Sequence, residues 1–253
     1  MGFDIYEGVA KTMKICIVFI GTNKYSDFFS GYYKACKDYF LPKHEKTFLV
    51  FTDQPKKEYY QKTDVYVNQI THVGWPWITL HRFKFMNSKR EFLANFDYVF
   101  FIDADLWPCA KIDDTILDHD CSFIGVQHPG FVDRIGTFET NTRSNANIFD
   151  SQYDLSKYRQ GCFWGGKANK IIEMIGILDK KVDEDTENNV VAIWHDESHM
   201  NKYFLQNNND VFTLHPGYAT PQQGYENIKS NYKTMMVHLH KDINEFPRFE
   251  GVK

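Results

Sequence analysis

The feature that most limits how this chain can fold is an apolar run followed at once by two acids. The run is Tyr98-Val99-Phe100-Phe101-Ile102, and Asp103-Ala104-Asp105 comes directly after it. Such a short run of β-branched and aromatic residues predicts a buried strand. Because residues two apart in an extended segment point to the same side, both carboxylates can face one point. Two hard oxygen ligands favour Mg²⁺ or Mn²⁺, although an acid after a strand is also a common cap.

The segments before this motif alternate between strand and helix patterns. Short apolar runs predict strands at 14–20, 47–51 and 65–70, and amphipathic patterns predict helices at about 26–40 and 78–96. This alternation predicts a three-layer α/β fold with a mostly parallel sheet. Ligands of such sheets bind beyond the carboxyl ends of the strands, where Asp103 and Asp105 would lie.

The pattern is less regular after Asp105. We expect a strand at 123–127, a loop-rich stretch at 137–158, and helices at 168–178 and 197–205, and we assign no element from about 206 onward. The segment 161–166, Gly-Cys-Phe-Trp-Gly-Gly, fits two interpretations equally. It is either a tight turn with core aromatic residues, or a place where the backbone approaches a ligand beside an apolar wall.

Composition excludes several classes of protein. The 253 residues are 43% hydrophobic, which is enough for a substantial core, and 29 basic against 33 acidic residues give a net charge of −4. We therefore expect no nucleic-acid partner. The apolar run from Ile15 to Gly21 is too short to span a membrane and follows no signal peptide, so we expect a soluble, cytoplasmic protein. Five cysteines without C-x-x-C spacing predict reduced thiols.

A second cluster of chemically active residues is Trp194-His195-Asp196-Glu197-Ser198-His199, which precedes an amphipathic helix. Asp196 could simply cap that helix, with Glu197 near the positive end of its dipole. A metal site at Asp103 and Asp105 would, however, require a second group to manage the reacting atom.

Together these segments resemble glycosyltransferase family six, which includes the histo-blood-group A and B transferases and the α-1,3-galactosyltransferases. The match runs from Lys14 to Leu214, and the ten residues from Trp194 to Tyr203 are its most specific block. The other matching blocks, in chain order, are Phe51-Thr52-Asp53-Gln54-Pro55, Asp103-Ala104-Asp105, His128-Pro129-Gly130-Phe131 and Gly165-Gly166.

The resemblance implies a Rossmann-like, nucleotide-sugar-binding fold of the GT-A type. It further implies retaining transfer of galactose or N-acetylgalactosamine from a UDP-sugar to a hydroxyl of a glycan acceptor, with an α-1,3 linkage. Mn²⁺ (or Mg²⁺), held by Asp103 and Asp105, would face the UDP diphosphate. The implied donor-binding residues are Ile20, Gly21, Thr22, Tyr25, Trp75, Arg82, Asp103, Ala104, Asp105, Gln160, Gly161, Cys162 and Asp196.

Glu197 is the implied catalytic carboxylate beneath the anomeric carbon, and with His128 and Trp194 it would also contact the acceptor. During transfer, positive charge develops on the sugar ring and negative charge on UDP. A carboxylate on the face of the sugar opposite UDP would stabilise the positive charge. Glu197 would act as a nucleophile in a double displacement, or as an electrostatic support in front-face transfer. The sequence leaves both routes open.

The resemblance also implies that Lys241 and Arg248 clamp the diphosphate as the site closes, although the local sequence differs from that of the animal enzymes. We assign no metal-binding role to the histidines beside Lys241. Cys162 stands where family members with glycine accept an acetamido group, which favours galactose as the donor sugar. The acceptor-binding segments 137–150 and 215–223 diverge from the family, so the acceptor is not predicted.

We expect an extension at 1–12 and one transferase domain at 13–253. Its parts would be a nucleotide-binding half at 13–105, a donor-sugar and acceptor half at 106–215, and a tail at 216–253 that closes over the donor. The expected relative is a soluble microbial or viral, metal-dependent enzyme. The alternatives are a UDP-sugar hydrolase and a non-catalytic UDP-sugar- or glycan-binding module. We discount a phosphohydrolase of the haloacid-dehalogenase type, because Trp107 stands where that class requires Thr or Val.

Overall fold

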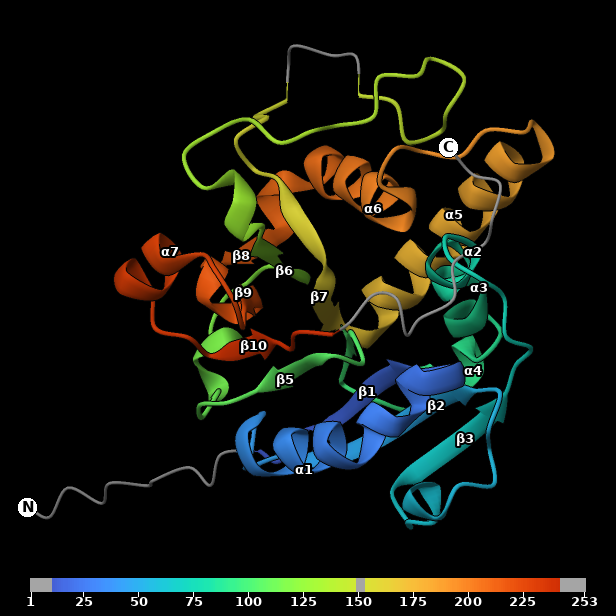
Figure 1. Ribbon diagram of the computed structural model, residues 1–253, viewed down its shortest axis with the longest axis vertical. Coiled ribbons are helices and arrows are strands. Elements are labelled where there is room, and N and C mark those ends of the chain that lie inside the picture. The colour runs from blue at the N-terminus through green and yellow to red at the C-terminus, as the bar shows by residue number, and fades with distance from the viewer. Residues whose placement is uncertain (1–10, 149–152, 242–253) are drawn as a thin grey trace, which may run out of the picture.

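A seven-stranded sheet runs through the centre of the protein (Figure 1). The computed structural model describes residues 11–148 and 153–241. The strand order is β3-β2-β1-β4-β7-β6-β8, and β7 alone among these strands runs antiparallel to its neighbours. The predicted, mostly parallel α/β sheet is therefore confirmed. The strands are β1 (Lys14–Ile20), β2 (Glu45–Thr52), β3 (Val65–Gln69), β4 (Tyr98–Ile102), β6 (Phe123–Gln127), β7 (Arg159–Lys167) and β8 (Val211–Leu214).

Both faces of the sheet are covered, which makes three layers. Along β1, Ile17 and Phe19 pack into one core while Cys16 and Val18 pack into the other, as the period of two in a strand requires. One face carries α1 (Phe29–Tyr39) and a small sheet of β5 (Leu106–Pro108), β10 (Met236–His238) and β9 (Thr220–Pro221), with α7 (Glu226–Asn231) beside it. The other face carries α2 (Trp77–Leu80), α3 (Arg82–Asn87), α4 (Arg90–Leu93), α5 (Ala168–Glu187) and α6 (His195–Gln206).

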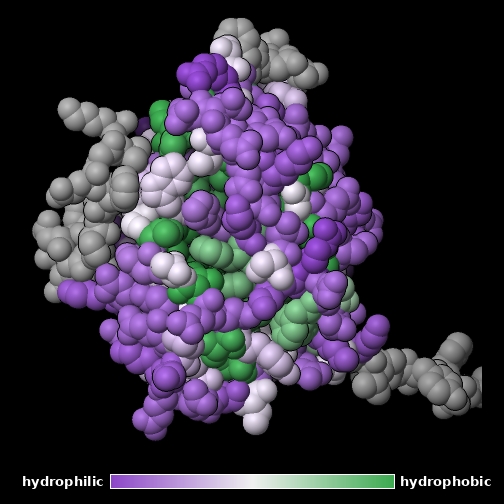
Figure 2. All heavy atoms as spheres, turned by 90° about the vertical axis from the view of Figure 1, so that its right-hand side faces the viewer, coloured by the Kyte–Doolittle hydropathy of each residue, from purple (hydrophilic) through white to green (hydrophobic). Residues whose placement is uncertain are grey.

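Six short 3₁₀ helices join these elements within the described part of the chain. They are η1 (Asn23–Phe28), η2 (Glu58–Tyr60), η3 (Asp114–Ile116), η4 (Pro129–Phe131), η5 (Asn208–Asp210) and η6 (Pro216–Ala219). The side of the molecule with α2 to α5 has a mostly hydrophilic surface around a smaller hydrophobic group (Figure 2). Among the residues that the structure describes, no helix has the length and apolar character needed to cross a bilayer.

Most predicted elements are present, with changes at their ends. The predicted helix 26–40 is the 3₁₀ helix η1 followed by α1, and the predicted helix 78–96 is three short helices. The break between α3 and α4 has one local cause. Where α3 ends, the Ser88 hydroxyl donates to the Phe85 carbonyl (2.6 Å) and so competes with the helical hydrogen bonds. The cysteines are free thiols, as predicted. The region from 206, to which we assigned no element, contributes η5, β8, η6, β9, α7 and β10.

The segment 161–166 is part of strand β7, so the interpretation as a tight turn is wrong. Its aromatic residues Phe163 and Trp164 are fully buried, one in each core, as the same interpretation expected. The neighbouring strands lie so close to Gly165 and Gly166 that they leave no room for a side chain. A Cβ on Gly165 would stand 2.6 Å from the carbonyl oxygen of Val99. At the other end of the segment, Gly161 and Cys162 line a pocket, so the alternative interpretation, a close approach to a ligand, stays a prediction there.

Replacing Gly165 with Ala should therefore destabilise the protein. Overpacking a close strand contact costs about 1–3 kcal/mol, to be measured as the free energy of unfolding in urea. Gly176→Ala in α5 is the matched control, because the added Cβ would meet Asn87 Oδ1 only at an ordinary contact distance of 3.7 Å. Because alanine favours a helix more than glycine does, Gly176→Ala should raise the free energy of unfolding by about 0.5–1 kcal/mol. Equal stabilities of the two variants would contradict the account of β7.

Candidate active site

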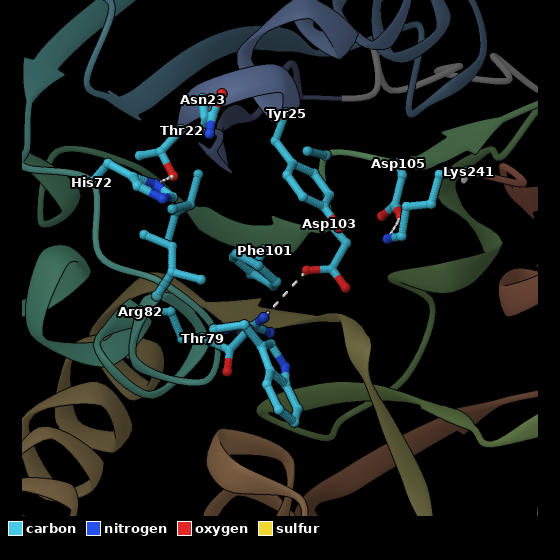
Figure 3. Close-up of a pocket in the computed structure, with 14 residues that line it drawn as sticks. Thr22, Asn23, Tyr25, His72, Thr79, Arg82, Phe101, Asp103, Asp105 and Lys241 are labelled. Atoms are coloured by element: carbon cyan, nitrogen blue, oxygen red, sulfur yellow. Dashed lines mark hydrogen bonds and ion pairs between the residues drawn. The ribbon is translucent and has the colours of Figure 1, made fainter. Parts of the chain in front are cut away.

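A pocket of about 310 Å³ opens at the carboxyl edge of the sheet, where β1 and β4 lie side by side (Figure 3). The chain continues from β1 to β2 on one side, whereas β4 lies on the other side, so the loops after β1 and β4 diverge and leave a crevice. The pocket is lined by Ile20, Thr22, Asn23, Tyr25, His72, Trp75, Ile78, Thr79, Arg82, Phe101, Asp103, Ala104, Asp105 and Lys241.

A second pocket of about 150 Å³ adjoins the first and shares Trp75, Thr79, Arg82 and Asp103 with it. Its other walls come from β7, from the start of α6 and from the end of β10. These walls consist of Gln160, Gly161, Cys162, Trp194, His195, Asp196, Glu197 and His238. The two predicted clusters, which are distant in sequence, are thus brought to one place.

The guanidinium of Arg82 joins the two pockets. It contacts Oδ1 of Asp103 (3.3 Å) and Oδ2 of Asp196 (3.0 Å), and it donates to the Gly161 carbonyl (2.8 Å). The guanidinium also lies over the ring of Phe101, 4.3 Å from its centroid. Burial alone would lower the pKa of Arg82, but the two carboxylates outweigh burial and raise it, so the side chain stays charged.

Both oxygens of Glu197 are held by hydrogen bonds. The Tyr158 hydroxyl donates to Oε1 and the Gly161 N–H donates to Oε2, each at 2.7 Å. Burial raises the pKa of Glu197 to about 7, although these two hydrogen bonds act in the opposite direction. Burial likewise raises the pKa of the neighbouring Asp196 to about 6, against the charge of Arg82. The site therefore holds two carboxyl groups that titrate near neutral pH.

Asp105 is buried and is paired with two basic residues near the end of the described chain. Its carboxylate contacts Nε2 of His238 (3.1 Å) and forms an ion pair with Lys241 (Figure 3). Burial would raise the pKa of Asp105, but His238 and Lys241 hold it below its usual value. Burial raises the pKa of Asp103 in spite of Arg82. Asp103, Asp105 and His238 can each offer one ligand atom to a cation, and these atoms lie within 4.8 Å of one another.

Three predicted residues lie outside the two linings. Gly21 stands beside the first pocket, where its N–H donates to the Phe51 carbonyl (3.0 Å). His128 accepts a hydrogen bond from the Gly130 N–H and packs against Tyr158, and burial lowers its pKa to about 4. His128 is thus one side chain away from Glu197. Arg248 lies outside the described residues.

Sequence reasoning missed several residues of the site. In the first pocket they are Asn23, His72, Ile78, Thr79 and Phe101, of which His72 hydrogen-bonds with the Thr22 hydroxyl (2.9 Å). Asn23 follows Thr22 and Phe101 lies two residues before Asp103, so their positions gave a usable signal. Tyr158 gave no signal, because its partner Glu197 is distant in sequence. His238 stands beside Lys241 in a segment to whose histidines we assigned no metal-binding role, and its contact with Asp105 appears only in the tertiary structure.

Comparisons with known proteins place this chain. The model of glycosyltransferase family 6 matches residues 4–246. The O-antigen biosynthesis glycosyltransferase WbnI of Escherichia coli is 32% identical over 217 residues, which cover 85% of this chain and 91% of that protein. The histo-blood group ABO system transferase 2 of Rattus norvegicus is 26% identical over 235 residues, 88% of this chain and 69% of the relative.

A third relative is the globoside alpha-1,3-N-acetylgalactosaminyltransferase 1 of Gallus gallus. It is 26% identical over 213 residues, 76% of this chain and 58% of the relative. The family match extends over nearly the whole chain, and the mostly parallel sheet agrees with the GT-A type of glycosyltransferase fold. This chain therefore belongs to glycosyltransferase family 6 and is a glycosyltransferase.

Proposed function

We propose that this protein is a metal-dependent, retaining hexosyltransferase that moves galactose or N-acetylgalactosamine from UDP to a glycan hydroxyl, forming an α-1,3 linkage. The observation that carries this proposal is the continuity of the two pockets through Arg82. Asp103 in the first pocket and Asp196 in the second contact the same guanidinium. A nucleotide diphosphate and the sugar attached to it need two such adjoining sites.

In this proposal the first pocket binds UDP. Thr22 and Tyr25 would face the nucleoside, and Asp103 and Asp105 would hold Mn²⁺ or Mg²⁺, whose oxygen preference fits two carboxylates. The bound ion would stabilise negative charge on the departing UDP without a proton transfer. Lys241, which lines this pocket, and Arg248 would add positive charge at the same diphosphate.

The second pocket would hold the donor sugar and the attacked hydroxyl. Asp196, which lines this pocket, would accept hydrogen bonds from sugar hydroxyls, while Glu197 would stabilise or attack the positive anomeric carbon. Tyr158 and Gly161 fix both Glu197 oxygens, so the carboxylate needs little reorganisation during the reaction. Trp194, about half exposed at the mouth of the pocket, and His128 behind Tyr158 would contact the acceptor.

The choice of donor sugar would depend on Cys162. Its side chain is buried and lines the second pocket beside Gln160. A thiol there removes space that an acetamido group would occupy, which favours galactose. Cys162 would matter because a sugar pocket excludes a donor with an acetamido group mainly by leaving too little volume for that group.

Two other activities are compatible with the same pockets. A UDP-sugar hydrolase would use water in place of the acceptor hydroxyl, and a binding module would retain UDP-sugar without turnover. The paired hydrogen bonds on Glu197 favour a catalytic site, because binding alone does not require a carboxylate fixed at both oxygens.

Asp105→Asn should abolish metal-dependent turnover of a UDP-sugar, because it removes an ionised ligand from the diphosphate site. The fold should persist, as judged by circular dichroism and thermal unfolding. The exposed Asp118 offers a control, since Asp118→Asn makes the same chemical change outside both pockets. Full activity of Asp105→Asn, or of the wild type in excess chelator, would refute the metal assignment.

The acid limb of the pH profile should report Glu197. Because its pKa is raised to about 7 and the ionised form is the active one, kcat/KM should rise with pH through about 7. Tyr158→Phe removes a hydrogen bond that favours the carboxylate, so this limb should move to higher pH. Tyr39→Phe, at an exposed site, is the control.

Glu197→Gln should remove the limb and lower kcat by roughly 10²–10³-fold, while calorimetry should show nearly unchanged UDP binding. A limb that stays in place in Tyr158→Phe would exclude Glu197 as the titrating group. A large loss of UDP affinity in Glu197→Gln would instead place this residue in nucleotide binding.

A further inference from the structure

The main chain fixes His238 beside Asp105, 133 residues away in sequence. Strand β10 pairs with β5 so that His238 lies opposite Leu106, the residue that follows Asp105. The next residue, Leu239, donates its N–H to the Asp105 carbonyl (2.8 Å). Because these contacts belong to the backbone of a sheet, they fix the main chain of His238 next to Asp105, within reach of its imidazole.

The ring nitrogen of His238 lies close to the carboxylate oxygens of both acids. Its Nε2 lies 3.1 Å from Oδ1 of Asp105, and the ligand atoms of Asp103, Asp105 and His238 all lie within 4.8 Å of one another. Adjacent ligands of an octahedral ion bound at about 2.1 Å are separated by about 3 Å. We propose that His238 is a direct ligand of the divalent cation, together with Asp103 and Asp105. This inference rests on the proposed function in placing a cation at the two acids.

The charges around the three side chains agree with this assignment. Two carboxylates and a neutral imidazole balance a divalent cation. In the structure the ammonium group of Lys241 pairs with Asp105 and supplies positive charge at the same carboxylate. Lys241 would therefore compete with the cation for Asp105, whereas His238 would bind the cation beside Asp105 through a neutral imidazole. This contrast separates the two basic residues into a ligand and a competitor.

A nitrogen ligand also changes the expected choice of ion. Mg²⁺ is bound best by oxygen atoms, whereas imidazole favours transition-metal ions. A site with one imidazole and two carboxylates should thus prefer Mn²⁺ over Mg²⁺. Without the imidazole, the affinities for the two ions should become more similar.

The test is pulsed electron paramagnetic resonance of Mn²⁺ bound to the full-length protein, recorded with and without UDP. Wild-type protein should show electron spin-echo modulation from a directly bound ¹⁴N nucleus, and labelling the histidines with ¹⁵N should change that signal. His238→Gln should lose the modulation and bind Mn²⁺ at least ~10-fold more weakly in titration calorimetry, with a smaller loss for Mg²⁺. The exposed His240, two residues along the same segment, provides the control His240→Gln, which should retain both properties.

Lys241→Met should bind Mn²⁺ alone more tightly than the wild type, because it removes the competing cation. Bound Mn²⁺ without nitrogen modulation in the wild type would overturn the proposal, and so would modulation that persists in His238→Gln. The wild-type spectrum decides the question even if a variant folds poorly. Nitrogen-coupled Mn²⁺ in a protein that turns over no UDP-sugar would sustain this assignment and reject the proposed function. Metal-dependent transfer without nitrogen coupling would reject His238 as a ligand and sustain the proposed function.

Discussion

The buried guanidinium of Arg82 is the interaction on which the arrangement of the site depends. It brings together the acid that follows β4, a carbonyl of β7 and an acid of α6. An unpaired charge at this depth would be strongly unfavourable, and removing one partner of a buried ion pair typically costs about 3–5 kcal/mol. Asp103, Asp196 and Arg82 are therefore each needed to keep the other two in place. The two pockets of the site are therefore built as one unit.

Strand β7 extends this constraint to the carboxylate of Glu197. The carbonyl of Gly161 accepts from Arg82, while its N–H donates to Glu197. A side chain at this position would crowd Glu197, since a Cβ would lie 3.2 Å from the Cβ of Glu197. One peptide segment thus links Arg82, which joins the pockets, to Glu197, the carboxylate that we propose to be catalytic. The small sheet has the corresponding role for Asp105, because β10 places His238 against it.

The parts of the fold that the sequence predicted correctly are those with a strong local signal. Strand β1 has the predicted limits, since seven consecutive residues with an apolar core are recognisable without their partners. Strand β7 was missed because glycines interrupt its pattern, and its strand conformation depends on pairing with β4 and β6. Strands β9 and β10, of two and three residues, are too short to carry any pattern and exist through their pairing.

The same distinction applies to the site. The spacing of Asp103 and Asp105 indicated a cation site from local geometry alone, and the cluster at Trp194 to His199 stood out by composition. By contrast, the roles of Arg82 and Glu197 came from the resemblance to the family, because nothing near Arg82 in sequence shows which charges it will meet. His238 and Tyr158 needed the tertiary structure, since each acts on a residue far away along the chain.

The most direct test of the central claim is UDP release from a panel of UDP-sugars in the presence of Mn²⁺, with and without an array of glycan acceptors. Transfer built on adjoining nucleotide and sugar pockets predicts release that is stimulated by an acceptor, with UDP-galactose the preferred donor. Release that is indifferent to every acceptor would identify a hydrolase and contradict the account. Absence of release from any donor would contradict it as well, and would leave a binding module in its place.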